Sequence, residues 1–387
     1  MSRKSITILG ATGSVGSSTL DLIDRNPDAF SIEALTAYRD VEGLALAARN
    51  SQAKLAVIGD ESLSGELADA LSGTGIETAS GAQGICDAAQ RGADLVMAAI
   101  VGAAGIRPVM DAIEAGSTLA LANKESLVSA GAIMTRAAKE RDVAILPVDS
   151  EHNAIFQCLD PTRPERVERI VLTASGGPFR TWDREAMRAV TPERAVQHPN
   201  WSMGAKISID SATMMNKGLE LIEAAHLFGL SPAQYAIVVH PQSVVHSMVE
   251  YVDGSVLAQM GAPDMRTPIA HTLAWPDRME TPCERLDLTA IGRLDFEAPD
   301  TERFPAIALA RAAMEEGGAK PAILNAANEQ AVAAFLAHNI GFLQITGIVA
   351  EVLDRYTPPA PGKLDDVFAI DREARRYADE AMEKQAA

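Results

Sequence analysis

Cysteine is scarce in this sequence of 387 residues. The three cysteines, Cys86, Cys158 and Cys283, lie far apart and include no CxxC spacing. An odd number of scattered cysteines argues against a disulfide framework and against a zinc site. We therefore expect a protein of a reducing compartment, the cytoplasm.

Long apolar runs are also missing. The first apolar run, residues 6–9, ends at Gly10, which is too short for the apolar core of a signal peptide. No run approaches the roughly 20 residues that a membrane-spanning helix needs. We expect no secretion signal and no membrane partner.

Basic residues are outnumbered, because 34 Lys and Arg face 52 Asp and Glu, for a net charge of −18. Such an acidic surface repels the phosphate backbone of nucleic acids and anionic membranes, so we expect neither as a partner. A small anionic ligand remains compatible with this charge, because a local basic pocket can outweigh the mean field.

The composition is that of a globular protein, with 47% hydrophobic and 22% charged residues. The chain is longer than one hydrophobic core usually organises, which predicts two or three domains. We find no internal repeat and no low-complexity tract.

The first part of the chain alternates short β-type runs with helical stretches. The predicted strands are residues 5–9, 31–37, 55–58, 95–100, 118–122 and 143–148, and the predicted helices are 17–24, 42–49, 61–71, 108–115 and 127–139. Strands connected by helical crossovers indicate a doubly wound, Rossmann-like parallel sheet of an α/β protein. We assign residues 1–148 to this nucleotide-binding domain.

The pattern changes after residue 148. Strand-like runs at residues 169–174, 235–239, 243–251 and 255–260 are separated by loops rich in Ser, Gly, Asn, His and Met. We predict a central α/β catalytic domain over 149–276 and a polar, proline-containing linker over 277–299. Residues 300–387 are rich in Ala and Glu with a 3.6-residue period, which predicts a C-terminal helical domain.

The turn after the first predicted strand reads GATGSVG at residues 10–16, a GxxGxxG variant of the dinucleotide-binding fingerprint. Glycines at such a turn let the backbone approach a pyrophosphate at a helix N-terminus, where free N–H groups favour negative charge. A glycine-rich turn without any ligand is the alternative.

The end of the second predicted strand bears on the choice between NADP and NAD. Arg39 could pair with the 2′-phosphate of NADP, whereas Asp40 is the residue type that contacts the free ribose of NAD. Arg39 could also be an ordinary solvated charge. The pattern favours NADP.

Polar residues follow two further predicted strands, at the sheet edge where α/β proteins bind ligands. Asn123, Lys124 and Glu125 follow the fifth strand, and Asp149 and Glu151 follow the sixth. Two carboxylates at this spacing can converge on a hard cation such as Mg²⁺ or Mn²⁺, and a third would complete the site. The alternatives are a solvated lysine and a helix N-terminus that carries acidic residues.

The second domain contains two loops of interest. Residues 172–179 place a turn of small residues after a strand, which suits backbone N–H contacts with an anion. The loop 198–204 joins His198, a possible acid or hydrogen-bond donor, to Trp201, and this suggests a lid over a ligand. That loop could equally be a packed connection.

The segment that follows contains another polar set. Ser211 could cap a helix on which Asn216, Lys217 and Glu220 lie within little more than one turn. Hydroxyl, amide and ammonium groups together would hold a phosphate, and Glu220 could be the third metal ligand. The alternative is an ordinary surface Lys–Glu pair.

Taken together, these segments resemble the 1-deoxy-D-xylulose 5-phosphate reductoisomerase family. The matching segments are GATGSVG, ANKES, VDSEHNAIFQCL, TASGGPFR, HPNWSMGAKISIDSATMMNKGLELIEA, HPQSVVHSMVEYVDGSVLAQMGAPDMRTPIA and PAILNAANEQAV. They occur in the expected order over nearly the whole chain.

The resemblance implies an enzyme of the non-mevalonate isoprenoid precursor pathway. It would convert 1-deoxy-D-xylulose 5-phosphate, with NADPH, into 2-C-methyl-D-erythritol 4-phosphate. The resemblance also implies a divalent cation (Mg²⁺, Mn²⁺ or Co²⁺) and a homodimer.

The resemblance assigns roles residue by residue. The metal ligands would be Asp149, Glu151 and Glu220; the phosphate contacts Ser175, Ser211, Asn216 and Lys217; the contacts to the rest of the substrate Lys124, Ser150, Glu151 and His198; and the cofactor contacts Thr12, Gly13, Ser14, Val15, Asn123, Glu125 and Gly204. Lys124, Glu151 and His198 would act in catalysis, with Trp201 and Met203 in the closing loop. Where many members have a Gly-Lys-Asn-like turn, this chain has Tyr38-Arg39-Asp40, so Arg39 and Asp40 are cofactor candidates on their own chemistry.

Two other functions share part of the pattern. An NADP-dependent dehydrogenase of the semialdehyde or homoserine type shares the nucleotide domain but needs no site of three carboxylates. A regulatory protein that senses a nucleotide needs no acids, amide and lysine around a second ligand.

Overall fold

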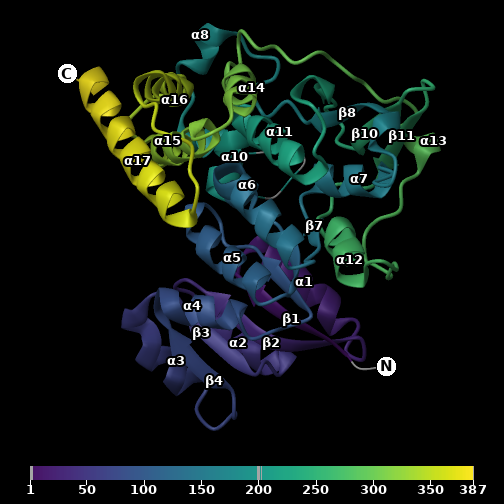
Figure 1. Cartoon of the computed structure of the whole chain (residues 1–387), viewed down its shortest axis with the longest axis vertical. Helices are drawn as coiled ribbons and strands as arrows, with labels where there is room; N and C mark the ends of the chain where they lie inside the picture. Colours follow the sequence, from purple (N-terminus) through teal and green to yellow (C-terminus); the bar gives the residue numbers. More distant parts are fainter. Residues whose placement is uncertain (1–2, 198–200, 202, 387) are drawn as a thin grey trace. The chain divides into compact units, whose positions relative to one another are not determined.

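The computed structural model describes residues 3–197, 201 and 203–386, which divide into two compact units (Figure 1). Unit 1 comprises Met1–Ser126, Met134–Asn153 and Met265–Cys283; unit 2 comprises Leu127–Ile133, Ala154–Asp264 and Glu284–Ala387. Helices α6 (Lys124–Glu140) and α7 (Ser150–Cys158) contribute residues to both units. Neither unit is therefore a continuous stretch of the chain.

Unit 1 is built on a seven-stranded parallel sheet with the strand order β4-β3-β2-β1-β5-β6-β7. The strands are β1 (Lys4–Leu9), β2 (Phe30–Ala37), β3 (Leu55–Ile58), β4 (Glu77–Ser80), β5 (Leu95–Ala98), β6 (Thr118–Leu121) and β7 (Ile145–Pro147). The crossovers contain α1 (Ser14–Asp24), α2 (Val41–Ser51), η1 (Glu61–Leu63), α3 (Ser64–Ala70), α4 (Gly81–Ala89), η2 (Ala103–Gly105) and α5 (Ile106–Glu114). The predicted doubly wound fold is confirmed.

Alternate residues of the central strands face two different cores, as expected for a sheet covered on both faces. Leu35 of β2 and Ile58 of β3 belong to the larger core, together with residues of β1, α1 and α2. Ala34 and Val57, on the opposite face, pack with Ala88 of α4.

Strand β4 and helix α4 were not among the predicted elements. Glu77 and Thr78 are exposed, so β4 lacks the apolar alternation of a buried strand. Gly84 resembles a loop residue, yet a Cβ there would lie 3.0 Å from the side chain of Val57. The glycine allows α4 to pack closely on β3.

Helix α12 (Arg266–Ala274) belongs to unit 1 although it follows most of unit 2 in sequence. Ile269 and Leu273 of α12 are buried in the larger core of unit 1. Arg266 forms a 3.1 Å ion pair with Asp21 of α1, and Lys4 donates a hydrogen bond to the Leu273 carbonyl at 3.0 Å. These contacts attach α12 to unit 1.

Unit 2 contains a four-stranded mixed sheet and most of the helices. In the sheet order β11-β10-β8-β9, β8 pairs parallel with β9, and β10 pairs antiparallel with β8 and β11. Its elements are β8 (Val167–Ala174), β9 (Tyr235–Val239), β10 (Val245–Tyr251) and β11 (Val256–Met260), with η3 (Pro164–Arg166), α8 (Arg184–Met187), α9 (Pro192–Ala195), α10 (Ala205–Ala212), α11 (Met215–Phe228), η4 (Pro232–Gln234) and α13 (Leu288–Ile291).

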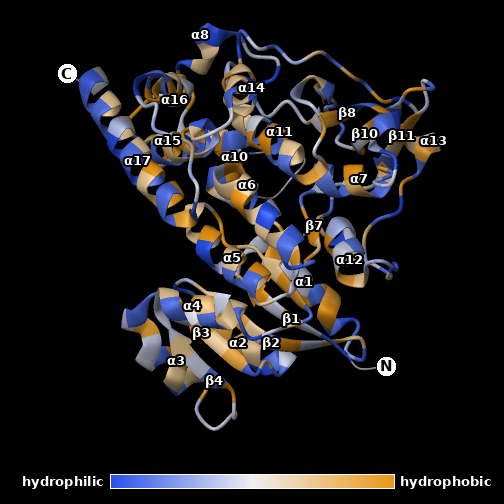
Figure 2. Cartoon of the chain, in the orientation of Figure 1, coloured by the Kyte–Doolittle hydropathy of each residue, from blue (hydrophilic) through white to orange (hydrophobic). Residues whose placement is uncertain are grey.

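The expected helices of the C-terminal region are present. They are α14 (Ala306–Glu316), α15 (Lys320–Leu336), α16 (Gln344–Arg355) and α17 (Leu364–Ala386). They share one core with α10 and α11, in which Phe342 packs edge-on against Phe179 and Phe335 at centroid distances of 5.3 and 5.8 Å. α17 carries both hydrophilic and hydrophobic residues, as an amphipathic helix does (Figure 2).

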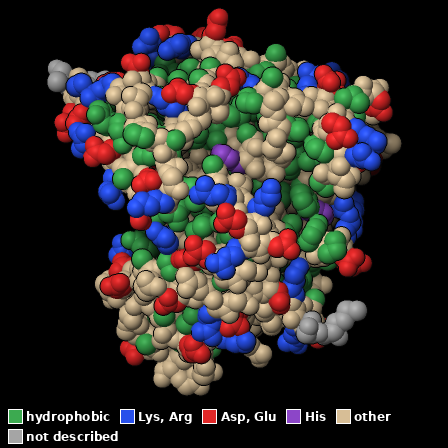
Figure 3. Space-filling view, in the orientation of Figure 1, with side chains coloured by type: hydrophobic (Ala, Val, Ile, Leu, Met, Phe, Trp, Pro, Cys, Tyr) green, Lys and Arg blue, Asp and Glu red, His purple; other side chains and the backbone are tan. Residues whose placement is uncertain are grey.

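The surface mixes both signs of charge. On the face drawn in Figure 3, Lys and Arg side chains are interspersed with Asp and Glu in spite of the net charge of −18. Within the part of the chain that the structure describes, no helix combines the length and the apolar character that crossing a membrane requires.

The attachment of α12 predicts a pH dependence of stability. Asn153 Nδ2 lies 3.2 Å from His271 Nδ1, which can accept this bond only when it carries no proton. Burial, assisted by the charge of Arg278, lowers the pKa of His271 to about 4. Below a pH of about 6.5 the unfolded chain therefore binds a proton that the folded chain excludes. We expect the stability contributed by His271 to be present near neutral pH and to fall as the pH drops from about 6.5 toward 4.

Thermal unfolding of wild type and His271→Gln at about pH 7.5 and about pH 5 checks this expectation, because glutamine retains a hydrogen-bond acceptor but does not titrate. The unfolding temperature of the wild type should fall more than that of the variant. Equal decreases in the two proteins would contradict the prediction.

Candidate active site

The glycine-rich turn of unit 1 has the geometry of an anion site. Gly10 adopts a φ of +89°, and a Cβ there would lie 2.7 Å from the carbonyl oxygen of Ala99. A Cβ at Gly16 would lie 2.3 Å from the Gly10 carbonyl. Helix α1 begins after Gly13 without a side-chain cap, and Gly13 and Ser14 are exposed. Its first N–H groups therefore face an accessible surface, as pyrophosphate binding requires.

Arg39 and Asp40, the two candidates for the choice between NADP and NAD, have different surroundings after the end of β2. The Asp40 carboxylate caps α2 by accepting a 2.9 Å hydrogen bond from the Gly43 N–H. Arg39 is largely exposed and forms a 3.2 Å ion pair with Asp60. Asp40 therefore has a local structural role, whereas the Arg39 guanidinium lies at the surface.

Asn123 forms the start of α6, directly after β6. Its side-chain oxygen accepts a 2.8 Å hydrogen bond from the Ser126 N–H, and its amide donates to the Gly102 carbonyl at 3.0 Å. The residue ties the N-terminus of α6 to the loop after β5. The position of Lys124, the next residue, is thereby defined.

The carboxyl edge of β6 and β7 brings four of the predicted residues together within unit 1. Lys124, whose side chain is 6% exposed, forms an ion pair with Asp149, which follows β7. Ser150 donates a 2.6 Å hydrogen bond to the Glu151 carboxylate. Glu125, predicted to contact the cofactor, is also buried. A buried cation paired with a carboxylate is not the solvated lysine of the alternative interpretation.

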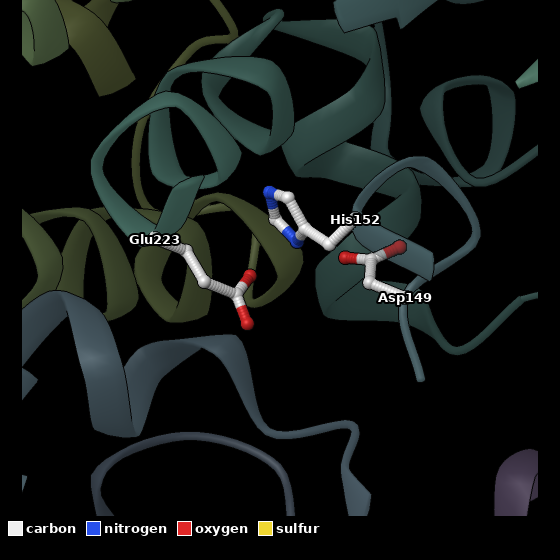
Figure 4. Close-up of side chains that lie close together, drawn as sticks. All are labelled: Asp149, His152 and Glu223. Carbon is white, nitrogen blue, oxygen red and sulfur yellow. The ribbon is translucent and has the colours of Figure 1, made fainter. Parts of the chain in front are cut away.

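Figure 4 shows Asp149 at the entrance to α7 and His152 on the first turn of that helix. It also shows Glu223, which belongs to α11 of unit 2. His152 and Glu223 are fully buried titratable residues that were absent from the predicted set. Helical spacing could have identified Glu223, because this residue lies about one turn beyond Glu220.

The turn after β8 lies against α10 within unit 2. Gly177 has a φ of +68°, and a Cβ there would lie 2.6 Å from the Ser211 carbonyl oxygen. The Ser175 hydroxyl accepts a hydrogen bond from the Gly177 N–H at 3.2 Å. Two hydroxyl residues predicted to contact phosphate, Ser175 and Ser211, are therefore brought together.

The polar residues of α11 form a buried cluster. Asn216 and Lys217 both donate to the Glu220 carboxylate. The Lys217 and Glu220 side chains are 4% and 0% exposed, so the interpretation as a surface pair is wrong. The helix begins directly after Met214, which has a φ of +62° and gives α11 no side-chain cap. The prediction that Ser211 caps this helix is wrong, because Ser211 lies within α10. The cluster and the helix N-terminus together suit an anion.

The predicted lid is only partly described. His198 lies outside the described residues, whereas Trp201 lies with its ring 6.2 Å from that of His246. Gly204, predicted to contact the cofactor, immediately precedes α10 and is exposed.

Comparison with known proteins gives matches to one family over most of the chain. Models of 1-deoxy-D-xylulose 5-phosphate reductoisomerase domains match residues 6–131, 145–228 and 260–377. The reductoisomerase of Zymomonas mobilis is 62% identical over 380 residues, covering 98% of this chain and 98% of that protein. The reductoisomerase of Rhodospirillum centenum is 57% identical, covering 98% and 94%.

The chain belongs to the 1-deoxy-D-xylulose 5-phosphate reductoisomerase family. Solved reductoisomerase structures agree with this assignment. The Zymomonas mobilis enzyme in complex with NADPH has a TM-score of 0.94 at 59% identity, covering 99% of this chain and 100% of that chain. A reductoisomerase in complex with NADPH, fosmidomycin and magnesium has a TM-score of 0.95 at 44% identity, covering 98% of each chain.

The buried Lys217–Glu220 pair predicts a strongly non-additive pair of substitutions. Glu220→Leu leaves the Lys217 ammonium buried without its carboxylate, which should lower the free energy of unfolding by about 3–5 kcal/mol. Lys217→Met/Glu220→Leu removes both charges and should recover most of that loss. Urea denaturation of the wild type, both single variants and the double variant, without divalent cation, measures the coupling. Additive losses would show that the two charges do not depend on each other.

Proposed function

We propose that this chain converts 1-deoxy-D-xylulose 5-phosphate into 2-C-methyl-D-erythritol 4-phosphate, using NADPH and a divalent cation, in the non-mevalonate isoprenoid precursor pathway. The observation that carries the proposal is the 62% identity to a reductoisomerase over 98% of this chain. Solved relatives are complexes with NADPH, with magnesium and with fosmidomycin. A semialdehyde- or homoserine-type dehydrogenase, the alternative from sequence, receives no comparable support.

The proposed cation ligands are Asp149, Glu151 and Glu220. Carboxylate oxygens are the donors that Mg²⁺ prefers and that Mn²⁺ and Co²⁺ also accept. Asp149 and Glu151 place one carboxylate oxygen each within 4.8 Å of one another, so these two ligands can converge on one cation, and the donor chemistry fits a dication. When bound, the cation supplies Lewis-acid stabilisation of negative charge that develops on substrate oxygens.

The proposed phosphate contacts are Ser175, Ser211, Asn216 and Lys217. Two hydroxyls, an amide and an ammonium group offer the donors that a phosphate accepts. Binding energy from this remote group can orient the reacting carbons of the substrate. The phosphate contacts thus contribute to rate as well as to affinity.

The residues proposed to face the reacting part of the substrate are Lys124, Ser150, Glu151 and His198. Lys124 donates toward the carbonyl and hydroxyl region, and Ser150 and Glu151 orient the hydroxyls. We assign His198 to the loop 198–204, which would close over the substrate and exclude water from its reacting carbons.

The proposed cofactor site combines the glycine-rich turn with residues that follow other strands. Its members are Thr12, Gly13, Ser14, Val15, Arg39, Asp40, Asn123, Glu125 and Gly204. Arg39 pairs with the 2′-phosphate, and Asp40 holds the start of α2 and thereby the position of Arg39.

We extend the proposal to the assembly and the location that the family resemblance implies, a homodimer in the cytoplasm. Size-exclusion chromatography with light scattering would test the dimer.

The main test is NADPH oxidation with 1-deoxy-D-xylulose 5-phosphate, with and without Mg²⁺. We expect turnover only when both cofactor and cation are present, and a loss on the order of 100-fold in kcat for Asp149→Asn, because a metal ligand is weakened. Asp142→Asn changes an acidic residue elsewhere in unit 1 and is the control. Cation-independent turnover, or full activity of Asp149→Asn, would favour a plain dehydrogenase.

The proposed role of Arg39 predicts a preference for NADPH over NADH. Arg39→Ala removes the charge opposite the 2′-phosphate, so we expect KM for NADPH to rise by on the order of 10-fold while KM for NADH hardly changes. Arg49→Ala, which removes another exposed arginine of unit 1, should leave both constants unaltered. A parallel rise for NADPH and NADH in Arg39→Ala would show that Arg39 does not read the 2′-phosphate.

A further inference from the structure

Helix α15 contains two fully buried asparagines. The helix is buried on nearly all sides and is otherwise dominated by alanine and larger apolar residues, yet Asn325 and Asn328 are both 0% exposed. A buried amide is unfavourable unless its polar atoms find hydrogen-bond partners. The partners of the two amide N–H groups therefore indicate why a polar residue is present.

Asn328 is bonded to a buried carboxylate on another helix. Its amide donates a 2.7 Å hydrogen bond to one oxygen of Asp210 in α10, and Lys206 forms a 2.8 Å ion pair with the other oxygen. Asp210 is 1% exposed. Each carboxylate oxygen thus has its own donor, one from within α10 and one from α15.

The carboxylate lies directly beside a proposed substrate contact. Asp210 immediately precedes Ser211, and the Ser211 carbonyl meets the Gly177 turn that also holds Ser175. A bond that fixes the last turn of α10 also fixes the distance between these two hydroxyl residues. Asn328 therefore acts on the phosphate contacts without belonging to them.

We propose that Asn328, acting through Asp210, is a positioning residue that holds Ser211 in place for the phosphate group of the substrate. This inference rests on the proposed assignment of Ser211 to that phosphate. Apolar packing already holds α10 and α15 together, because Ile209 and Ala212 of α10 lie in the same apolar core as α15. A buried polar contact adds little net stability to such a core but defines one orientation.

The test compares Michaelis constants of charge-exchange variants. Asn328→Asp places a second carboxylate against Asp210, and we expect KM for the phosphorylated substrate to rise by about 10-fold or more while KM for NADPH stays within about twofold. Asp210→Asn/Asn328→Asp restores a carboxylate–amide bond with the partners exchanged, and KM should return to within about threefold of wild type.

The matched control is Asn325→Asp. Asn325 is equally buried on the same helix, but its amide donates to Ser129 at 3.4 Å and to Glu329 at 3.1 Å. We expect this control to lower the unfolding temperature without changing KM, because a buried charge destabilises the helix but does not touch α10. If Asn328→Asp does not fold, Asn328→Ala serves instead, with a smaller rise in KM.

Two results would overturn the inference. The first is a wild-type KM in Asn328→Asp and Asn328→Ala, with only their thermal stability lowered. The second is a rise in KM for Asn325→Asp as large as that for Asn328→Asp. Ser211→Ala separates this failure from that of the proposed site. A wild-type KM in Ser211→Ala would remove the phosphate assignment and this inference with it. A raised KM in Ser211→Ala, with wild-type values in both Asn328 variants, would remove only the role of Asn328.

Discussion

The structure depends most on the burial of charge in paired form. Lys217 with Glu220, Lys124 with Asp149, and Lys206 with Asp210 each place an ammonium group against a carboxylate with little access to water. Isolated charges could not be buried in this way, so each residue requires its partner. The surrounding helices must therefore hold the polar groups in register. For the two pairs of unit 2, Lys217–Glu220 and Lys206–Asp210, the apolar core that α10 and α11 share with the C-terminal helices supplies that rigidity.

The sequence predicted the parallel sheet well, because buried strands such as residues 55–58 are short apolar runs between clear helical segments. It missed β4, whose exposed edge position removes the apolar pattern, and α4, whose glycines resemble loop residues. The return of α12 to unit 1 was also hidden, because local pattern carries no information about which distant core a helix joins.

For the candidate site too, the sequence predicted some residues and missed others. Motif chemistry identified Lys124, Asp149 and Lys217. The fold buries Lys124 and Lys217. It pairs Lys217 with Glu220, the neighbour expected from helical spacing, and Lys124 with Asp149, a pair that the sequence did not predict. Residues that act through others were missed, as Asn328 illustrates, because their role depends on a contact between α15 and α10 that is 118 residues apart in sequence. Only an unexplained asparagine among alanines marked that position.

The interleaving of the two units has a consequence for protein synthesis. The chain passes from one unit to the other after residues 126, 133, 153, 264 and 283. A ribosome that has released the whole parallel sheet has still not released α12, whose Ile269 and Leu273 fill the core beneath it. Cotranslational folding, which normally proceeds domain by domain from the N-terminus, must here leave the nucleotide-binding unit with exposed apolar surface until most of its neighbour has been made.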